Sequence, residues 1–304
     1  MSWDKEINEI LKKKEFALQQ GGKDNVERQH SKGLLTIRER ITLILDDNTF
    51  EEIGPGAGGA ERDKNGGLIK FNPANFVLGF GKINGRDCVI GGEDFTVKGG
   101  SPTEAGLRKS IYIEDLAIQN LVPLVRLHQG GGGSVTGASG NTQVSTSPVY
   151  NPPRFKTVAQ TLQAIPVATA ALGAVAGLPA ARLVASHFSI MTKNNSQVLI
   201  AGPKVVERAL GQNVTKEDMG GAHIHTRNGV VDNIAEDETD ALAQIKIFLS
   251  EKKVFKILII LFNFFGEIKK TIEQFNFDKI AKSSVNIFFF SGKNHRRKIY
   301  LRIH

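Results

Sequence analysis

The sequence predicts an α/β fold in which parallel strands alternate with helices. Apolar helical patterns lead repeatedly into short apolar strand patterns, and these strands end in glycine-rich turns. A content of 40% apolar and 23% charged residues, with 32 Gly and 10 Pro, is typical of a globular protein. Ligands of such folds bind where a strand ends and the following helix begins, so the glycine-rich turns are the first candidates for a site.

Two amphipathic helices are predicted near the amino terminus. Residues 3–18 have helical spacing with a lysine-rich, solvated side. The apolar side of this helix consists of Trp3, Ile7, Ile10 and Leu11. A second helix begins at Thr36, because Thr36 and Glu39 have the spacing of a capping box, in which each side chain accepts a free main-chain N–H. Its buried stripe consists of Ile37, Ile41, Ile44 and Leu45.

The next predicted feature is an antiparallel hairpin that follows a glycine-rich loop over residues 54–67. The apolar runs 76–83 and 87–90 flank Asn84-Gly85, a pair that tolerates the positive φ angles of a type I′ turn. Residues 54–59 also fit a dinucleotide-binding pattern. A proline lies inside that pattern and no helical pattern follows it, so it does not support a dinucleotide site.

Two helix–strand–turn units follow the hairpin. The first consists of a helix over 103–120, a strand over 122–127 and a turn over Gly130–Gly133. The second consists of a helix over 155–163, a strand over 167–172, a turn over 173–177 and a helix over 179–186, which has Pro179 in its first turn. Further strands are expected over 188–191 and 198–200, and a further helix over 203–210.

The charge and cysteine content exclude several classes of protein. The net charge is +8, but the basic surplus lies wholly in residues 251–304, so the body has no basic face for nucleic acid. Cys88 is the single cysteine, which excludes an internal disulfide and a cysteine-based zinc site. The first ten residues carry charges where a signal peptide is apolar, and Lys256 interrupts the longest apolar stretch, so we expect no membrane span and a cytoplasmic location.

The composition changes at residue 251, which predicts a division into a domain over residues 1–250 and a tail over 251–304. The tail holds half of the 18 Phe and is rich in Lys, Ile and Asn, the residues that A+T-rich codons specify. One interpretation is an out-of-frame segment. The other is a divergent pair of helices with exposed lysines, and the nucleotide sequence distinguishes the two.

The glycine-rich turns suggest a chemical role. Main-chain N–H groups can bind an oxygen that becomes negatively charged during a reaction, and glycine allows a ligand to approach them. Gly131 and Gly132 from the first turn, with Gly177 and the N–H of Leu178 from the second, are the candidate donors. An isolated glycine turn is more often a simple connection, but two turns at equivalent points of consecutive units favour a shared site.

The chain resembles the amino-terminal half of the carboxyltransferase (β) subunit of biotin-dependent acyl-CoA carboxylases, the propionyl-CoA and methylcrotonoyl-CoA carboxylase family. The matching segments occur in the family's order across roughly residues 25–250. They are His30–Asp46, Gly91–Ser101, Pro123–Gly133, Val175–His187, Ser196-Gln197, Ala201–Pro203, Gly220–His225 and Asn228–Asp232. The resemblance implies a crotonase-like fold.

The resemblance also implies a reaction and its partners. The family transfers a carboxyl group from carboxybiotin, held on a separate biotin carboxyl carrier protein and loaded by a biotin carboxylase, to the α-carbon of an acyl-CoA through an enolate. In the family the active site lies between the first half of one subunit and the second half of another, so the resemblance implies a homo-oligomer. It implies no metal in this chain. In the family a second homologous half holds the biotin, and this sequence stops matching near Ser250. We expect the chain to bind acyl-CoA without completing the transfer alone.

By resemblance, the first turn, Gly130–Gly133, corresponds to the acyl-CoA oxyanion hole of the family. The second turn begins at Ala176, and Leu178 stands where relatives commonly have glycine. Ser134 replaces an arginine of many relatives, and both departures affect the acyl specificity. Lys32 and Arg38 are expected near the CoA nucleotide, although solvation alone would also explain either of them.

Two alternatives to a carboxyltransferase are compatible with the sequence. One is another crotonase-like activity on acyl-CoA, such as a decarboxylase, hydratase or hydrolase, and the other is an inactive fragment that keeps only association surfaces.

Three histidines are candidates for a chemical role. His223 and His225 would point the same way on a strand, but without an acidic partner at metal spacing a hydrogen-bonding role is expected. His128, beside the first turn, is a secondary candidate for proton transfer.

Overall fold

The computed structural model describes residues 3–131, 154–250, 285–290 and 298–303. The chain divides into two compact units, Met1–Lys256 and Ile257–His304. In the second unit, β11 (Val285–Phe290) and β12 (Lys298–Ile303) form an antiparallel pair. Of the two interpretations of the tail, the pair of helices does not hold for these residues, which form strands.

The first unit is built around an eight-stranded sheet with the order β1-β4-β5-β6-β7-β8-β10, in which β9 also pairs with β7. Its strands are β1 (Glu51–Glu52), β4 (Phe76–Ile83), β5 (Arg86–Glu93), β6 (Leu124–Gly130), β7 (Val167–Ala176), β8 (Phe188–Thr192), β9 (Gln197–Leu199) and β10 (Asn233–Ala235). The β1–β4 and β4–β5 pairs are antiparallel, whereas every pairing from β5 to β10 is parallel. This arrangement is the predicted α/β fold.

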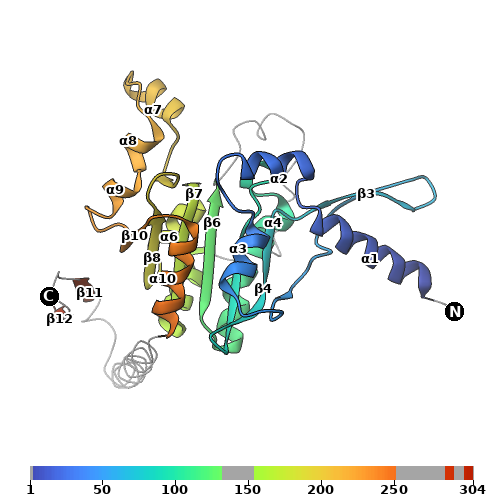
Figure 1. The fold of residues 1–304 in the computed structure, drawn as a ribbon, viewed down its shortest axis with the longest axis horizontal. Coiled ribbons are helices and arrows are strands. Elements are labelled where there is room, and N and C mark those ends of the chain that lie inside the picture. Colours follow the sequence, from blue (N-terminus) through green and yellow to red (C-terminus); the bar gives the residue numbers. More distant parts are fainter. Residues whose placement is uncertain (1–2, 132–153, 251–284, 291–297, 304) are drawn as a thin grey trace, which may run out of the picture. The chain divides into compact units, whose positions relative to one another are not determined.

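Helices cover both faces of this sheet (Figure 1). On one face, α3 (Ile37–Ile44) and α10 (Glu238–Ser250) pack side by side over β4 to β8. On the other face, α4 (Glu104–Asn120) and α5 (Arg154–Ala164) pack together over β4 to β7. A third helix, α6 (Leu178–Val184), packs on β6 and β7. The two apolar layers fix the strands, and therefore their carboxyl ends, in position.

The strongest local predictions are confirmed. Thr36 caps α3 in a capping box with Glu39, and the predicted stripe of isoleucines is buried. The β4–β5 hairpin turns at Asn84 and Gly85, whose φ angles are 51° and 75° as a type I′ turn requires. The strand predicted over 122–127 is real but extends to Gly130, and its partner β7 extends to Ala176.

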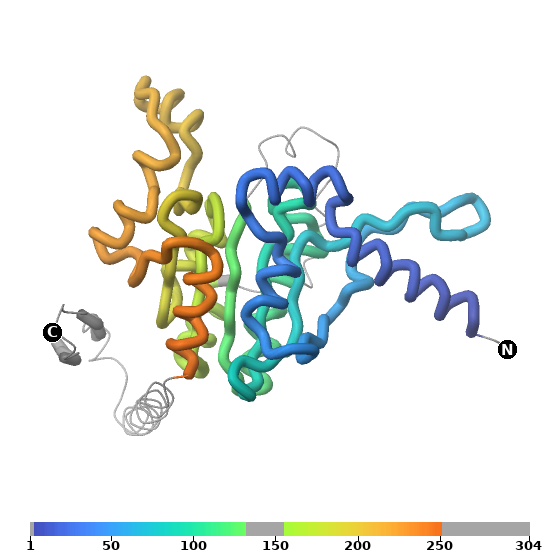
Figure 2. Tube along the Cα trace, viewed as in Figure 1, coloured from blue at the N-terminus to red at the C-terminus, as the bar shows by residue number. Residues whose placement is uncertain are grey.

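The amino-terminal helix α1 (Asp4–Leu18) forms as predicted, but its apolar side is not buried. Trp3 before the helix is 68% exposed, and Ile7, Ile10 and Leu11 on it are each about half exposed. The helix extends away from the sheet and contacts β3 (Leu68–Pro73) (Figure 2). Helical spacing identifies an apolar side, but only tertiary structure decides whether that side is covered.

Several elements have no counterpart in the sequence prediction. Part of the expected glycine-rich loop is the strand β2 (Gly58–Arg62), which forms an antiparallel pair with β3. The remaining helices are α2 (Lys23–His30), α7 (Pro203–Leu210), α8 (Lys216–Gly220), α9 (Ala222–His225) and the single turn η1 (Lys98–Gly100). Of these, only α7 was predicted. His223 and His225 therefore lie on a short helix, and their placement on a strand was wrong.

Candidate functional site

The two glycine turns lie at the same edge of the sheet because β6 and β7 are parallel neighbours. Gly130, the last residue of β6, is in register with Val175, and β7 ends one residue later at Ala176. The turns that begin with Gly131 and Gly177 therefore start at adjacent points of the sheet. Gly132 and Gly133 lie outside the described residues. The prediction that two consecutive units bring their turns together is supported by this register.

A tight main-chain contact joins η1 to the end of β6, directly before the first turn. A Cβ atom on Gly130 would lie 2.8 Å from the Gly100 carbonyl oxygen, and one on Gly100 would lie 2.6 Å from the Gln129 carbonyl oxygen. Both distances are too short for any side chain, so η1 and the end of β6 pack through glycine alone. Gly130 is thus needed for this contact, whatever ligand the turn binds.

The second turn offers one amide rather than two. Gly177, with φ 69° and ψ −130°, reverses the chain into α6. Its N–H donates to the Leu199 carbonyl oxygen at 3.3 Å, so the expectation that Gly177 provides a free donor is corrected. Leu178 is the first residue of α6, where no carbonyl of the helix can accept its N–H. Leu178 is half-buried, and its amide is the candidate donor of this turn.

A buried ion pair lies immediately before the first turn. The Nδ1 atom of His128 is 3.2 Å and 3.1 Å from the two carboxylate oxygens of Glu93 at the end of β5. The Gln129 N–H also donates to Glu93, at 3.3 Å from Oε2. Burial raises the pKa of Glu93, but the charge and hydrogen bond of His128 outweigh burial, and the pKa falls below its ordinary value. Sequence reasoning assigned no role to Glu93, although it lies in the matching segment Gly91–Ser101.

A second buried cluster holds α6 against β6 and α4. Glu114 of α4 accepts hydrogen bonds from Arg126 of β6 at 2.7 Å and from Arg182 of α6 at 2.8 Å. Thr157 of α5 donates to the same carboxylate at 2.6 Å. Because α6 carries the second turn and β6 the first, this carboxylate fixes the two turns relative to each other. The residues are far apart in sequence, and the prediction contained none of these contacts.

Lys32 lines a cavity of about 350 Å³ close to the first turn. The cavity is lined by Asn25, Arg28, Gln29, Lys32, Phe95, Thr96, Lys98 and Gly99. Gln29 connects it to the strand end, because its Nε2 donates to the Gln129 Oε1 at 2.6 Å. The Lys32 ammonium lies 5.8 Å from the centre of the Phe95 ring. Three cationic side chains beside an aromatic ring suit a ligand that carries phosphates and a base.

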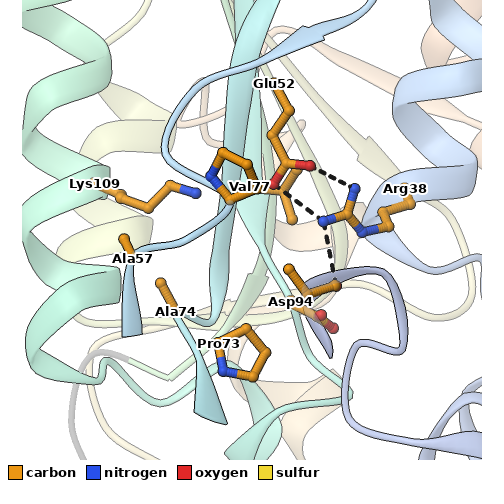
Figure 3. Close-up of a pocket in the computed structure, with 10 residues that line it drawn as sticks. Arg38, Glu52, Ala57, Pro73, Ala74, Val77, Asp94 and Lys109 are labelled. Atoms are coloured by element: carbon orange, nitrogen blue, oxygen red, sulfur yellow. Dashed lines mark hydrogen bonds and ion pairs between the residues drawn. The ribbon is translucent and has the colours of Figure 1, made fainter. Parts of the chain in front are cut away.

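Arg38 is committed to a different contact (Figure 3). Its guanidinium forms a bidentate ion pair with Glu52, at 2.8 Å and 3.1 Å, and donates to the Ala17 carbonyl at 3.3 Å. The small cavity beside it, about 10 Å³, has room for roughly one water molecule. The two terminal nitrogens of Arg38, which was expected near a CoA nucleotide, thus bind Glu52 of β1 and the Ala17 carbonyl of α1.

Lys109 of α4 lines the same small cavity and is nearly buried. Its ammonium donates to the Gly54 carbonyl at 3.2 Å, and Figure 3 shows it on the side of the cavity opposite Arg38. The pKa of Lys109 is lowered to about 8, chiefly by burial; the Glu52 charge opposes this change and the Arg38 charge adds to it. At neutral pH the fold therefore carries a poorly solvated positive charge.

We expect Lys109→Met to stabilise the protein at neutral pH. The unfolded chain binds more protons than the folded chain between the folded pKa of about 8 and the ordinary value of 10.5, so the wild-type free energy of unfolding rises over that range. At pH 7 the variant should be more stable by about 2 kcal/mol. This difference is the desolvation cost of the Lys109 ammonium minus the contribution of its lost hydrogen bond to the Gly54 carbonyl. Urea unfolding at pH 7 and pH 10 measures this difference, with exposed Lys156→Met as the control; a difference independent of pH would contradict it.

The histidines of α9 make local contacts. The Nε2 of His225 lies 2.9 Å from the Val198 carbonyl, and the Nδ1 of His223 lies 3.4 Å from Glu217. Within the described ranges, no three His, Cys, Asp or Glu side chains come together as metal ligands would. Across the same ranges, no helix has the length and apolar character needed to cross a membrane.

Comparison with known families agrees with this geometry. Residues 28–253 match the carboxyl transferase domain family, and this segment contains both glycine turns and the buried clusters described above. The chain belongs to the carboxyl transferase domain family. The resemblance identified from the sequence is thereby confirmed, together with the crotonase-like α/β fold that it implied.

The curated relatives of this carboxyl transferase domain include two carboxylase subunits and a decarboxylase subunit. The biotin-dependent acetyl-/propionyl-coenzyme A carboxylase beta5 subunit of Mycobacterium tuberculosis is 34% identical over 80% of this chain and 44% of its own length. The propionyl-CoA carboxylase beta chain of Cereibacter sphaeroides is 32% identical over 79% and 46%. The methylmalonyl-CoA decarboxylase subunit alpha of Veillonella parvula is 33% identical over 75% and 44%. The chain spans about half the length of these relatives.

Solved structures show the same domain. The transcarboxylase 12S structure with methylmalonyl-coenzyme A and methylmalonic acid bound has a TM-score of 0.66 and 27% identity, over 82% of this chain and 48% of that one. A single-chain, multi-domain long-chain acyl-CoA carboxylase has a TM-score of 0.67 and 25% identity, over 81% and 25%. The carboxyl transferase fold of this chain is thus shared by proteins that act on CoA thioesters.

Proposed function

We propose that this carboxyl transferase domain binds an acyl-CoA and stabilises the enolate of its thioester, as the acyl-CoA side of an acyl-CoA carboxylase. The observation that carries the proposal is the register of β6 and β7, which starts both glycine turns at neighbouring points of the sheet. The N–H groups of Gly131 and Leu178 are the proposed donors to the enolate oxygen. Gly132, as a further donor, and Gly133, as a contact to the acyl-CoA, are proposed from the family resemblance alone, and Gly177 provides the chain reversal.

The chemistry requires donors that are already oriented. Removal of the α-proton places negative charge on the thioester oxygen, and main-chain amides fixed by a strand end and a helix start stabilise this charge without reorganising. Gly130 has no side chain and Ala176 has only a methyl group, so the ends of both strands leave room for the acyl group. The enolate carbon would then form the new bond to the carboxyl carbon, while the bond between that carbon and N1 of biotin breaks and its electron pair stays on the biotin ring.

The cavity lined by Lys32 is the proposed site for the phosphates of CoA. Arg28, Lys32 and Lys98 give it positive charge, and Phe95 offers a surface for stacking. The contact between Gln29 and Gln129 places this cavity next to the turn where the thioester would lie. A single extended CoA ester can therefore be proposed to contact both features.

The carboxyl donor and the assembly are proposed from the relatives. N1-carboxybiotin, carried on a separate carrier protein and charged by a biotin carboxylase, would supply the carboxyl group. We further propose a cytoplasmic homo-oligomer and a functional domain over residues 1–250 that is distinct from residues 251–304. The support is the biotin-dependent carboxylase subunit among the relatives and the hexamer named for the transcarboxylase 12S structure.

The binding proposal is tested by calorimetric titration of the chain with propionyl-CoA. We expect binding that Lys32→Glu weakens about tenfold at low salt, which corresponds to ~1.4 kcal/mol. Lys216→Glu, an exposed lysine of α8, is the control and should leave the affinity unchanged. If the wild-type chain gives no heat of binding, the proposal is contradicted and an inactive fragment is favoured. If the two variants lower the affinity equally, the cavity lined by Lys32 is not the phosphate site.

A second candidate function is decarboxylation of an acyl-CoA, which the decarboxylase subunit among the relatives favours. The two functions use the same enolate but differ in their need for a carboxyl donor. Methylmalonyl-CoA incubated with the chain in the absence of any biotin carrier distinguishes them. Release of propionyl-CoA and carbon dioxide would support the decarboxylase, and no release by a chain that binds methylmalonyl-CoA would exclude decarboxylation without a carrier.

A further inference from the structure

The residues directly before the first glycine turn form a buried hydrogen-bonded unit with the end of β5. His128 is 1% exposed and Glu93 is 6% exposed. The Glu93 carboxylate binds both the Nδ1 of His128 and the N–H of Gln129, so it contacts a side chain and a main-chain amide of consecutive residues. An ionised carboxylate only accepts, which requires that Nδ1 carry the proton.

Such a unit is needed because glycine does not fix its own conformation. Gly131, the first residue after β6, has access to a wide range of φ and ψ, so it cannot orient its amide through intrinsic preference. The orientation must come from the residues on either side. On the β6 side, the peptide between His128 and Gln129 is the last one that contains no glycine atom, and its N–H is the group that Glu93 holds.

The Gln129 side chain is held as well. Its Nε2 lies 3.3 Å from Gln29 Oε1, and its Oε1 accepts from Gln29 Nε2. The Gln129 carbonyl oxygen lies against Gly100 in the tight glycine contact behind the turn. The main-chain N–H, the side chain and the carbonyl of this residue therefore each have a packed neighbour, and Glu93 is the only charged one of the three.

We propose that Glu93 and His128 are positioning residues that orient the amides of the Gly130–Gly131 turn. His128 holds the Glu93 carboxylate through Nδ1, and the carboxylate holds the main chain through the Gln129 N–H. The consequence for catalysis rests on the proposed function, because these amides include the donor to the enolate oxygen. The main-chain effect itself is independent of any ligand.

The Nε2 atom of His128 suggests a different role for this residue, proton transfer. It is buried and has no hydrogen-bond partner among the described residues. A proton-transfer role would require Nε2, whereas the positioning role requires Nδ1. Asparagine places its amide nitrogen near the position of Nδ1 and has no atom at the position of Nε2, so His128→Asn separates the two roles. His128→Leu removes both atoms.

The experiment is amide hydrogen exchange at Gln129, whose N–H Glu93 holds, resolved by NMR on the full chain without ligand. We expect His128→Leu to accelerate exchange about 10- to 100-fold, as for the loss of a hydrogen bond to a charged group, and His128→Asn to restore most of the protection. His187→Leu is the matched control. Its Nδ1 accepts the Val167 N–H at 3.1 Å at the opposite end of β7, so its loss should not change exchange at the turn.

The same variants are then titrated with acetoacetyl-CoA, whose bound enolate is followed by its near-ultraviolet absorption. We expect the enolate signal to be lost with His128→Leu and largely regained with His128→Asn. Unchanged exchange with His128→Leu, or a His128→Asn variant as impaired as His128→Leu, would overturn the positioning role. If His128→Leu alters the exchange but the wild-type chain gives no enolate signal, the positioning role is supported and the proposed function is contradicted.

Discussion

Glu114→Leu is expected to destabilise the first unit by about 3–5 kcal/mol, the cost of leaving buried charges unpaired. Glu114 is fully buried and binds the guanidinium groups of Arg126 and Arg182. Burial lowers the pKa of Arg126 to about 10, and the Glu114 carboxylate opposes this change. Without the carboxylate, two buried cations would face each other with no counter-charge from α4.

Urea unfolding measures this loss, and α4 provides the matched control. Glu104 in the first turn of the same helix forms an ion pair with Arg108, but both side chains are about half exposed. Glu104→Leu should therefore cost at most ~1 kcal/mol, as for other surface ion pairs. Comparable losses in the two variants would contradict the view that Glu114 holds α6 and β6 together.

Leu178→Pro is expected to lower enolate stabilisation about 10²- to 10³-fold, the usual effect of removing one oxyanion donor. Proline lacks an N–H, and its fixed φ suits the first residue of a helix, so the substitution removes the proposed donor with little change of backbone. Leu178→Ala is the matched control because it shortens the side chain and keeps the N–H. The affinity for CoA itself should change in neither variant.

The acetoacetyl-CoA enolate signal measures this effect, with calorimetry of CoA binding alongside. The proposal requires a loss of signal in Leu178→Pro and its retention in Leu178→Ala. If both variants lose the signal equally, the leucine side chain rather than its amide is responsible. If neither loses it, the second turn contributes no donor.

Local features of the fold were predictable because local sequence determines them. The Thr36 capping box, the Asn84-Gly85 turn and the glycine turns after β6 and β7 each depend on a few consecutive residues. Both strands nevertheless extend beyond their predicted ends at residues 127 and 172. The same information placed the candidate amides in consecutive units. The parallel pairing of β6 with β7 then brought those units together.

The contacts that support the turns were not predictable because they join distant residues. Glu93 and His128 are 35 positions apart, and Glu114 and Arg182 are 68 positions apart. Arg38 was assigned to a ligand because its partner Glu52 lies outside the motif that drew attention to it. A motif can indicate that a charged residue has a role, but only the fold determines which group that residue binds.

The central claim is that amides from both turns meet at one oxygen, and a crystal structure of the chain with a bound acyl-CoA tests it most directly. The account predicts the thioester oxygen within hydrogen-bond distance, ~2.7–3.2 Å, of the Leu178 nitrogen and of a glycine nitrogen in the first turn. A thioester bound elsewhere, or an oxygen that contacts neither nitrogen, would contradict it.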